Sequence, residues 1–190
     1  YNAEIATVLE KKGDKEVLVL FNIVENDKTY VKKIDFQGNR TFSDKTLRNI
    51  MKTTEWGIFH FFTDSGVLKK DQLKQDIGKL NAFYLNNGFI NAQVGEPEIT
   101  HDKKGIYLKV PVSEGRQVKV GKVQLTGDTL KVPHDALLKN LSITKQEYFS
   151  REAMIKDIDY LVQMCNAEGF ASADVPFPTA PEEKGQPVAV

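Results

Sequence analysis

Hydrophobic and polar positions repeat in one order along this chain, over long distances. YLNNGFINAQV, residues 84–94, returns as CNAEGFASADV at residues 165–175, and the opening YNAEI reads as the end of a third copy. The matching glycines lie 81 positions apart (169 minus 88), and Ala3 precedes Ala92 by 89 (92 minus 3). Periods of this length indicate small domains in series rather than a solenoid of short repeats.

Alternation of apolar and polar residues predicts the strands. A shift of 89 carries one alternating run onto another: Val17, Val19, Phe21 and Ile23 onto Ile106, Leu108, Val110 and Val112. The pattern predicts an N-terminal hairpin over residues 1–26 and later strands over residues 30–37, 89–96, 106–113, 118–125 and 171–177. Pro111 removes a donor from its strand, so we expect one-sided pairing or a bulge there.

Helical spacing predicts two helices in each later unit. Ser43 is a suitable N-cap for a helix ending near Thr53, and Ser150 caps a later one. A helix over residues 70–86 carries one apolar stripe, which returns in the helix after Ser150: Leu73, Ile77, Leu80 and Tyr84, then Met154, Ile158, Leu161 and Cys165. Gly88 ends the first of these long helices. In the third unit, a short helix is expected from Pro133 through Leu141, ahead of the helix after Ser150.

These elements predict an α+β protein whose units follow the order β-α-α-β-β. Residues 1–27 are expected to be the closing hairpin of a preceding domain, and residues 28–115 a complete domain. Residues 116–190 form the next domain, truncated in its last strand at the terminal VAV. Because both ends cut into repeats, we interpret the sequence as a piece of a longer chain.

Composition narrows the function. The 26 Lys and Arg balance 26 Asp and Glu, so no net charge favours nucleic acid as a partner. The single cysteine, Cys165, excludes a disulfide within the chain, and its position on the apolar stripe predicts a buried, inert thiol. The longest apolar runs have the length of strands, so none of them is a membrane-spanning segment.

Candidate chemistry is sparse. The three histidines have no partners at ligand spacing and phosphate-binding glycine motifs are absent, so we expect no metal, no cofactor and no enzymatic activity: His60, His101 and His134. Asp76 and Asp157 recur at matching helix positions, and Glu25 and Glu114 at matching strand ends. Repetition across diverged units predicts caps or polar groups at interfaces.

Two stretches are candidate binding sites. The first is an uncharged strand, an unprotected edge unless a neighbouring domain covers it: Phe89, Ile90, Asn91, Ala92, Gln93, Val94 and Gly95. The second is an aromatic loop, which either binds a partner or packs on its own helices or on the adjacent unit: Trp56, Phe59, Phe61 and Phe62.

The β-α-α-β-β order, IDFQGNRTFSD, FYLNNGFINAQV and VSEGRQVKVGKV together resemble serial POTRA domains of the BamA family of outer-membrane protein assembly factors. The resemblance covers essentially the whole chain. It implies a three-stranded mixed sheet with two helices on one face, and an edge strand after the second helix: residues 89–96, matched by 171–177 and 1–9.

The resemblance also implies a location and partners. Such domains lie at the periplasmic face of the outer membrane of a Gram-negative bacterium, ahead of a membrane β-barrel in the same chain. They bind unfolded outer-membrane proteins and the lipoproteins of the BAM complex, and strand addition would provide affinity that tolerates many client sequences. POTRA regions of TamA or two-partner secretion transporters, and a passive spacer, remain alternatives.

Overall fold

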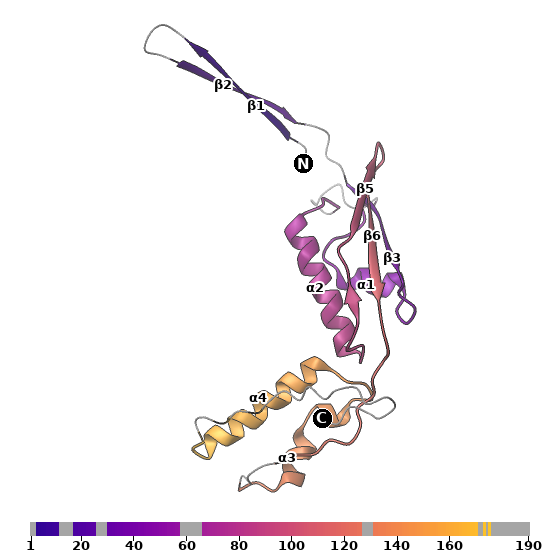
Figure 1. Ribbon diagram of the computed structural model, residues 1–190, viewed down its shortest axis with the longest axis vertical. Helices are drawn as coiled ribbons and strands as arrows, with labels where there is room; N and C mark the ends of the chain where they lie inside the picture. Colours follow the sequence, from indigo (N-terminus) through magenta and orange to yellow (C-terminus); the bar gives the residue numbers. More distant parts are fainter. Residues whose placement is uncertain are drawn as a thin grey trace.

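The structure is a computed structural model that describes residues 3–11, 17–25, 30–57, 66–126, 131–170, 173 and 175. Figure 1 shows an N-terminal hairpin, a middle unit with a sheet and two helices, and a third unit with further helices. Among the described residues, no helix combines the length and the apolar character that crossing a membrane would need.

The middle unit is organised around its last strand, β6 (Gly105–Ser113). On one side β6 pairs in parallel with β3 (Val31–Gln37), and on the other it pairs antiparallel with β4 (Gln93–Val94) and β5 (Glu98–Asp102). Because β4 and β5 follow one another along the same edge, the sheet is three strands wide and mixed, as the resemblance implied.

Two helices cover one face of this sheet. Helix α1 (Asp44–Ile50) begins where Ser43 accepts a hydrogen bond from the backbone N–H of Thr46, which confirms the predicted cap. Helix α2 (Lys70–Asn86) has the predicted bounds, and Gly88 follows it with φ of +85°. Both helices share one core with the sheet: Val31, Ile34, Phe36, Leu47, Met51, Leu73, Leu80, Tyr84, Phe89, Val94, Leu108, Val110 and Val112. The α+β class and the β-α-α-β-β order are therefore confirmed for this unit.

The strand predicted over residues 89–96 is not continuous. Residues 90 and 91 form a turn, and pairing begins only at Gln93. Three residues, 95–97, lie between the pairs Val94–Val112 and Glu98–Lys109, opposite only residues 110 and 111. This extra residue is a bulge, and it falls opposite Pro111, where the sequence led us to expect a bulge or one-sided pairing.

The third unit contains α3 (His134–Asn140), a 3₁₀ turn over Ile143–Lys145 and α4 (Arg151–Ala167). Ser150 caps α4 by accepting from the backbone N–H of Ala153, as expected. The strand predicted over residues 118–125 is wrong in this structure, since only the isolated bridge between Lys119 and Tyr148 forms there. Its expected parallel partner, the terminal VAV, lies outside the described residues.

The N-terminal hairpin pairs β1 (Ala3–Lys11) with β2 (Val17–Glu25) through nine consecutive residue pairs. Its register agrees with the repeat, because Glu4–Val24 and Ile5–Ile23 correspond to Gln93–Ser113 and Val94–Val112. No bulge interrupts this hairpin, where Asn22 stands in place of Pro111. All its side chains over residues 5–10 and 17–23 are exposed.

Candidate strand-accepting edge

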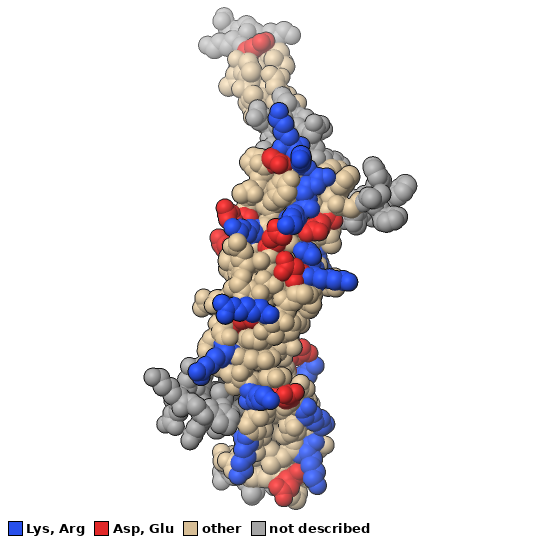
Figure 2. Space-filling model, turned by 90° about the vertical axis from the view of Figure 1, so that its right-hand side faces the viewer, with Lys and Arg blue, Asp and Glu red and all other residues tan. Residues whose placement is uncertain are grey.

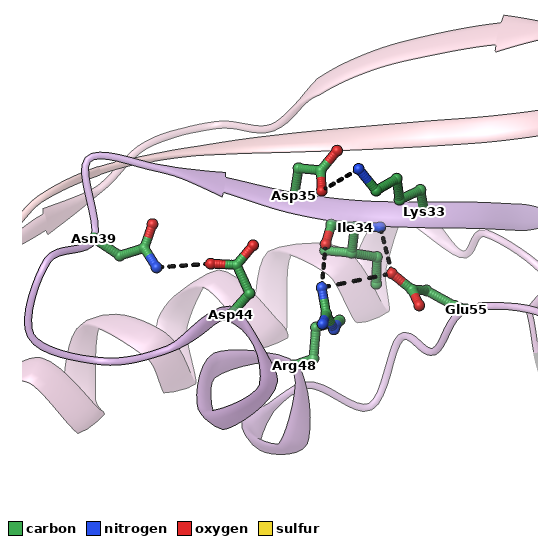
Figure 3. A network of polar contacts seen from close by, with 7 residues as sticks. All are labelled: Lys33, Ile34, Asp35, Asn39, Asp44, Arg48 and Glu55. Atoms are coloured by element: carbon green, nitrogen blue, oxygen red, sulfur yellow. Dashed lines mark hydrogen bonds and ion pairs between the residues drawn. The ribbon is translucent and has the colours of Figure 1, made fainter.

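The outer side of β3 is closed by side chains. The backbone N–H of Ile34 donates to Glu55 Oε1 at 2.8 Å, and Arg48 Nη1 donates to the Ile34 carbonyl at 2.9 Å. Arg48 and Glu55 lie 3.7 Å apart, so one ion pair satisfies both backbone groups of Ile34 (Figure 3). The pair occupies the place of a neighbouring strand, and strand addition at Ile34 would have to displace it.

The start of β3 is closed by main chain. Val31 donates its N–H to the Gly66 carbonyl and accepts from the Trp56 N–H, each at 2.7 Å. The Trp56 ring lies 5.7 Å from the Tyr30 ring, and Lys32 Nζ lies 3.9 Å from its centroid. Trp56 thus packs on the strand, whereas the other aromatics of the predicted docking loop lie outside the described residues: Phe59, Phe61 and Phe62.

Glu114 closes the turn after β3. Its Oε1 accepts from the backbone N–H of Arg40 at 2.9 Å, from that of Thr41 at 3.0 Å and from the Tyr84 hydroxyl at 3.1 Å. Burial by itself raises the pKa of Glu114, but the hydrogen bonds from Thr41, Arg40 and Tyr84 outweigh it and lower the pKa from its ordinary value. In the same turn, Asn39 donates to Asp44 at 2.8 Å (Figure 3).

Asp76 and Asp157 act alike in the two units. Asp76 accepts from the backbone N–H groups of Lys52 and Thr53 after α1, at 2.8 and 2.7 Å. Asp157 accepts from Ser142 and Ile143 after α3, at 2.6 and 2.7 Å. The prediction of repeated caps is confirmed for this pair, and Glu114 also accepts from backbone N–H groups. The side chain of its counterpart Glu25 is not described.

The outer side of β4 is closed by one residue of α2. Asn81 Oδ1 accepts from the Val94 N–H at 2.9 Å, and Asn81 Nδ2 lies 3.4 Å from the Val94 carbonyl oxygen as a donor. An amide side chain presents both a donor and an acceptor, so it can satisfy an outward-facing residue as a neighbouring strand would. At Val94 this edge is therefore not available without moving Asn81.

The outer side of β5 is different. All five of its residues are exposed, and among the described residues β6 is its one pairing partner. Ile99, opposite the buried Leu108 of β6, leaves 43% of its surface in solvent. One row of β5 backbone donors and acceptors thus faces away from β6, next to a partly exposed apolar side chain.

The predicted edge residues are divided between several environments. Phe89 and Val94 are buried, at 3% and 7% exposure, and Ala92 packs at the margin of the same core. Ile90 packs instead against the core of the third unit. Asn91 and Gln93 are exposed and Gly95 donates to the Pro111 carbonyl at 2.9 Å. The binding role of this stretch stays a prediction.

Sequence reasoning missed β5 because its polar letters, EITHD, resemble a loop. The available signal was the alternation of the apolar Ile99 with the polar Glu98 and Thr100, just before the turn-forming letters DKKG of residues 102–105. The capping roles of Arg48, Glu55 and Asn81 could not be recognised from the sequence, because Arg, Glu and Asn are equally common as ordinary surface residues.

Charge and metal chemistry add nothing at this edge. Figure 2 shows positive and negative side chains mixed over the face in view, with neither sign covering it alone. Within the described part of the chain, no group of three His, Cys, Asp or Glu side chains has the arrangement for a metal ion. His101 is exposed on β5, His134 is the first residue of α3, and His60 lies outside the described residues. Cys165 is half-buried rather than fully buried.

The sequence model of the POTRA family, described as a surface antigen variable number repeat, matches residues 29–115 and 118–190. Two BamA outer-membrane protein assembly factors are similar in sequence. The one from Nitratidesulfovibrio vulgaris is 28% identical over 87% of this chain, and the one from Neisseria meningitidis 29% over 94%. The chain spans about a fifth of these relatives, 21% and 23%.

A solved structure of POTRA domains 3–5 of Haemophilus influenzae BamA is similar in fold. It aligns with a TM-score of 0.53 and 20% identity, over 74% of this chain and 54% of that one. The chain belongs to the POTRA family, and its fold is that of POTRA domains from outer-membrane protein assembly factors.

Proposed function

We propose that this chain is the POTRA region of a BamA-like outer-membrane protein assembly factor. It would work at the periplasmic face of a Gram-negative outer membrane, with a membrane β-barrel elsewhere in its protein. Its clients would be unfolded outer-membrane proteins and its fixed partners the lipoproteins of the BAM complex. The family membership and the similar BamA relatives support this placement.

Clients would bind as an added strand. The observation that carries this proposal is the contrast between β5, which has one paired side, and β3 and β4, whose outer backbone groups are capped. Main-chain hydrogen bonds recognise an extended backbone rather than a particular sequence of side chains, which suits a factor with many clients. We therefore extend the proposed interface from Phe89–Gly95 to include Glu98–Asp102.

The expected contact is short. Strand β5 has five residues, bounded by the bulge at residues 95–97 and by the turn at Lys103 and Lys104. A client would pair over about this length, with one of its side chains placed beside Ile99. Short, sequence-tolerant pairing predicts weak and reversible binding, as a factor that hands its clients on requires.

An amide NMR titration with a peptide copied from an outer-membrane β-strand tests this. Shifts centred on Glu98–Asp102 that persist at moderate salt are expected, because backbone hydrogen bonds depend little on ionic strength. Ile99→Lys places a charge at the open edge and is expected to weaken binding about tenfold. Gln37→Lys, which adds the same charge at the exposed last residue of β3, is the matched control and should bind like the unmodified chain.

Other outcomes distinguish the alternatives. A response at Trp56 without one at β5 would mean recognition by side-chain docking. If no described residue responds at millimolar peptide, strand addition is wrong for this region and the passive spacer becomes the better reading.

A further inference from the structure

A hollow lies where the middle and third units meet, away from both sheet edges. The C-terminal end of α2 lies next to the N-terminal part of α4 (Figure 1). Between them is a hollow of about 350 Å³, within the roughly 300–1,000 Å³ of ligand pockets. Its walls are side chains of both helices: Ala82, Leu85 and Asn86 from α2, and Arg151, Glu152, Ile155 and Lys156 from α4.

The apolar lining is not required by either helix. Leu85 and Ile155 lie off the apolar stripes that face the two cores, and Ile155 is 44% exposed. In the repeat, Leu85 corresponds to Asn166 and Ile155 to Lys74, both polar. The fold therefore accepts polar residues at these two helix positions. Leu85 and Ile155 nevertheless are apolar, and both lie where α2 of the middle unit contacts α4 of the third unit.

The two walls are held together by hydrogen bonds. The backbone N–H of Glu152 donates to Asn86 Oδ1 at 2.9 Å, and the Val118 N–H donates to the Gly88 carbonyl at 2.8 Å. Gln117 Nε2 donates to the Asn87 carbonyl at 2.9 Å. The hollow is thus preformed, and it exists only while the two units keep this arrangement.

The charged side chains of the hollow have a net positive charge, because Arg151 and Lys156 outnumber Glu152. Glu152 pairs with Lys156 at 2.7 Å, which leaves the charge of Arg151 uncompensated; among the described residues no acceptor engages its guanidinium. Because both walls are helices, they present no strand edge to which a strand could be added. An occupant has to be recognised by its side chains.

We propose that this junction hollow docks a helical segment of a partner protein that carries an apolar side chain and a carboxylate one turn apart. The apolar group packs on Leu85 and Ile155, and the carboxylate pairs with Arg151. Docking of an amphipathic helix in an apolar groove is one of the recurring modes of peptide recognition. Since both units contribute to the hollow, binding also stabilises their relative arrangement. This inference does not depend on strand addition at β5.

Two synthetic peptides test the proposal on the 190-residue chain by amide NMR. One is an amphipathic helix with Leu and Glu at i, i+4 spacing, and the other has Lys in place of every Glu. The acidic peptide is expected to shift residues 82–86 and 151–156, and the basic peptide to leave them unmoved. Equal shifts from both peptides, or no shift in these residues, would overturn the proposal.

Variants separate the two contacts. Ile155→Lys, which copies Lys74, should weaken binding about tenfold, and Arg151→Gln should weaken it at least about threefold and remove its salt dependence. Lys139→Gln, at an exposed position of α3, is the matched control and should leave the affinity and its salt dependence unchanged. Thermal unfolding of Ile155→Lys is expected to match the unmodified chain. Unchanged affinity in both Ile155→Lys and Arg151→Gln would exclude this hollow as the docking site.

Discussion

The two outer strands of the middle sheet differ in how their free backbone groups are satisfied. Strand β3 is capped by the Arg48–Glu55 pair, whereas β5 is exposed along all of its five residues and, within the described part of the chain, pairs on one side. Unprotected edges invite association, so most folds cover them. A sheet that covers one edge and leaves the other open can add a strand in one place only, which gives the interaction a defined position.

Acidification is expected to have the largest effect on both edges, because several carboxylates stabilise the middle unit that carries them. The pKa of Glu114 lies below its ordinary value of 4.5; burial raises it, but hydrogen bonds from Thr41 and Arg40 outweigh burial. Burial likewise raises the pKa of Asp76, and bonds from Lys52, Lys79 and Thr53 lower it below 3.8. Their stabilisation is complete above these ordinary values and is lost as pH falls through the folded-state pKa values.

Urea unfolding between pH 7 and pH 3 measures this loss. The free energy of unfolding should fall below about pH 4.5, where the unfolded chain binds more protons than the folded chain. Glu114→Gln should lower stability at pH 7 and flatten the pH dependence. A stability that is constant down to pH 3 would contradict the proposed role of these carboxylates.

Opening the closed edge is the next largest change. Arg48→Ala combined with Glu55→Ala removes both partners of Ile34 and should cost about 2 kcal/mol of unfolding free energy, because hydrogen bonds to charged groups are lost at a partly buried strand. The same strand peptide should then also shift residues near Ile34. Peptide binding that stays confined to β5 would show that the caps do not decide which edge is used.

Extending the open edge is expected to have a smaller effect. Asn81→Ala uncaps Val94 and should cost about 1–2 kcal/mol in urea unfolding, the usual penalty for a buried polar group left without its partner. The peptide footprint on amide NMR should lengthen from β5 toward Gln93. Gln75→Ala, which removes an amide from an exposed position of the same helix, controls for the loss of the side chain itself.

Straightening the open edge should change stability least. Pro111→Val restores a backbone donor in β6 at the position that Asn22 holds in the continuous N-terminal hairpin. Since Pro111 is exposed, we expect a change within about 1 kcal/mol. Slower amide exchange at Gly95, Glu96 and Glu98 would indicate that Pro111 maintains the bulge, and unchanged exchange would assign the bulge to Gly95–Pro97 instead.

Elements that depend on close neighbours were predictable from the sequence. Ser43 and Ser150 cap helices through bonds that span three residues, and Gly88 takes its positive φ directly after α2. The repeat also located the paired Asp76 and Asp157 before their partners were known. Such features follow from periodicity and capping within a few positions, which one sequence contains in full.

The location of the open edge was decided by the tertiary structure. Residues far apart in the chain produce it: Asn81 caps Val94 across 13 positions, and Glu55 caps Ile34 across 21. The junction hollow likewise needs α2 and α4 side by side. By itself the sequence determined which units, helices and turns form, because those depend on local patterns. Only the packing of distant segments decided which backbone groups remain free to bind, because each cap is a contact between residues that the sequence does not place together.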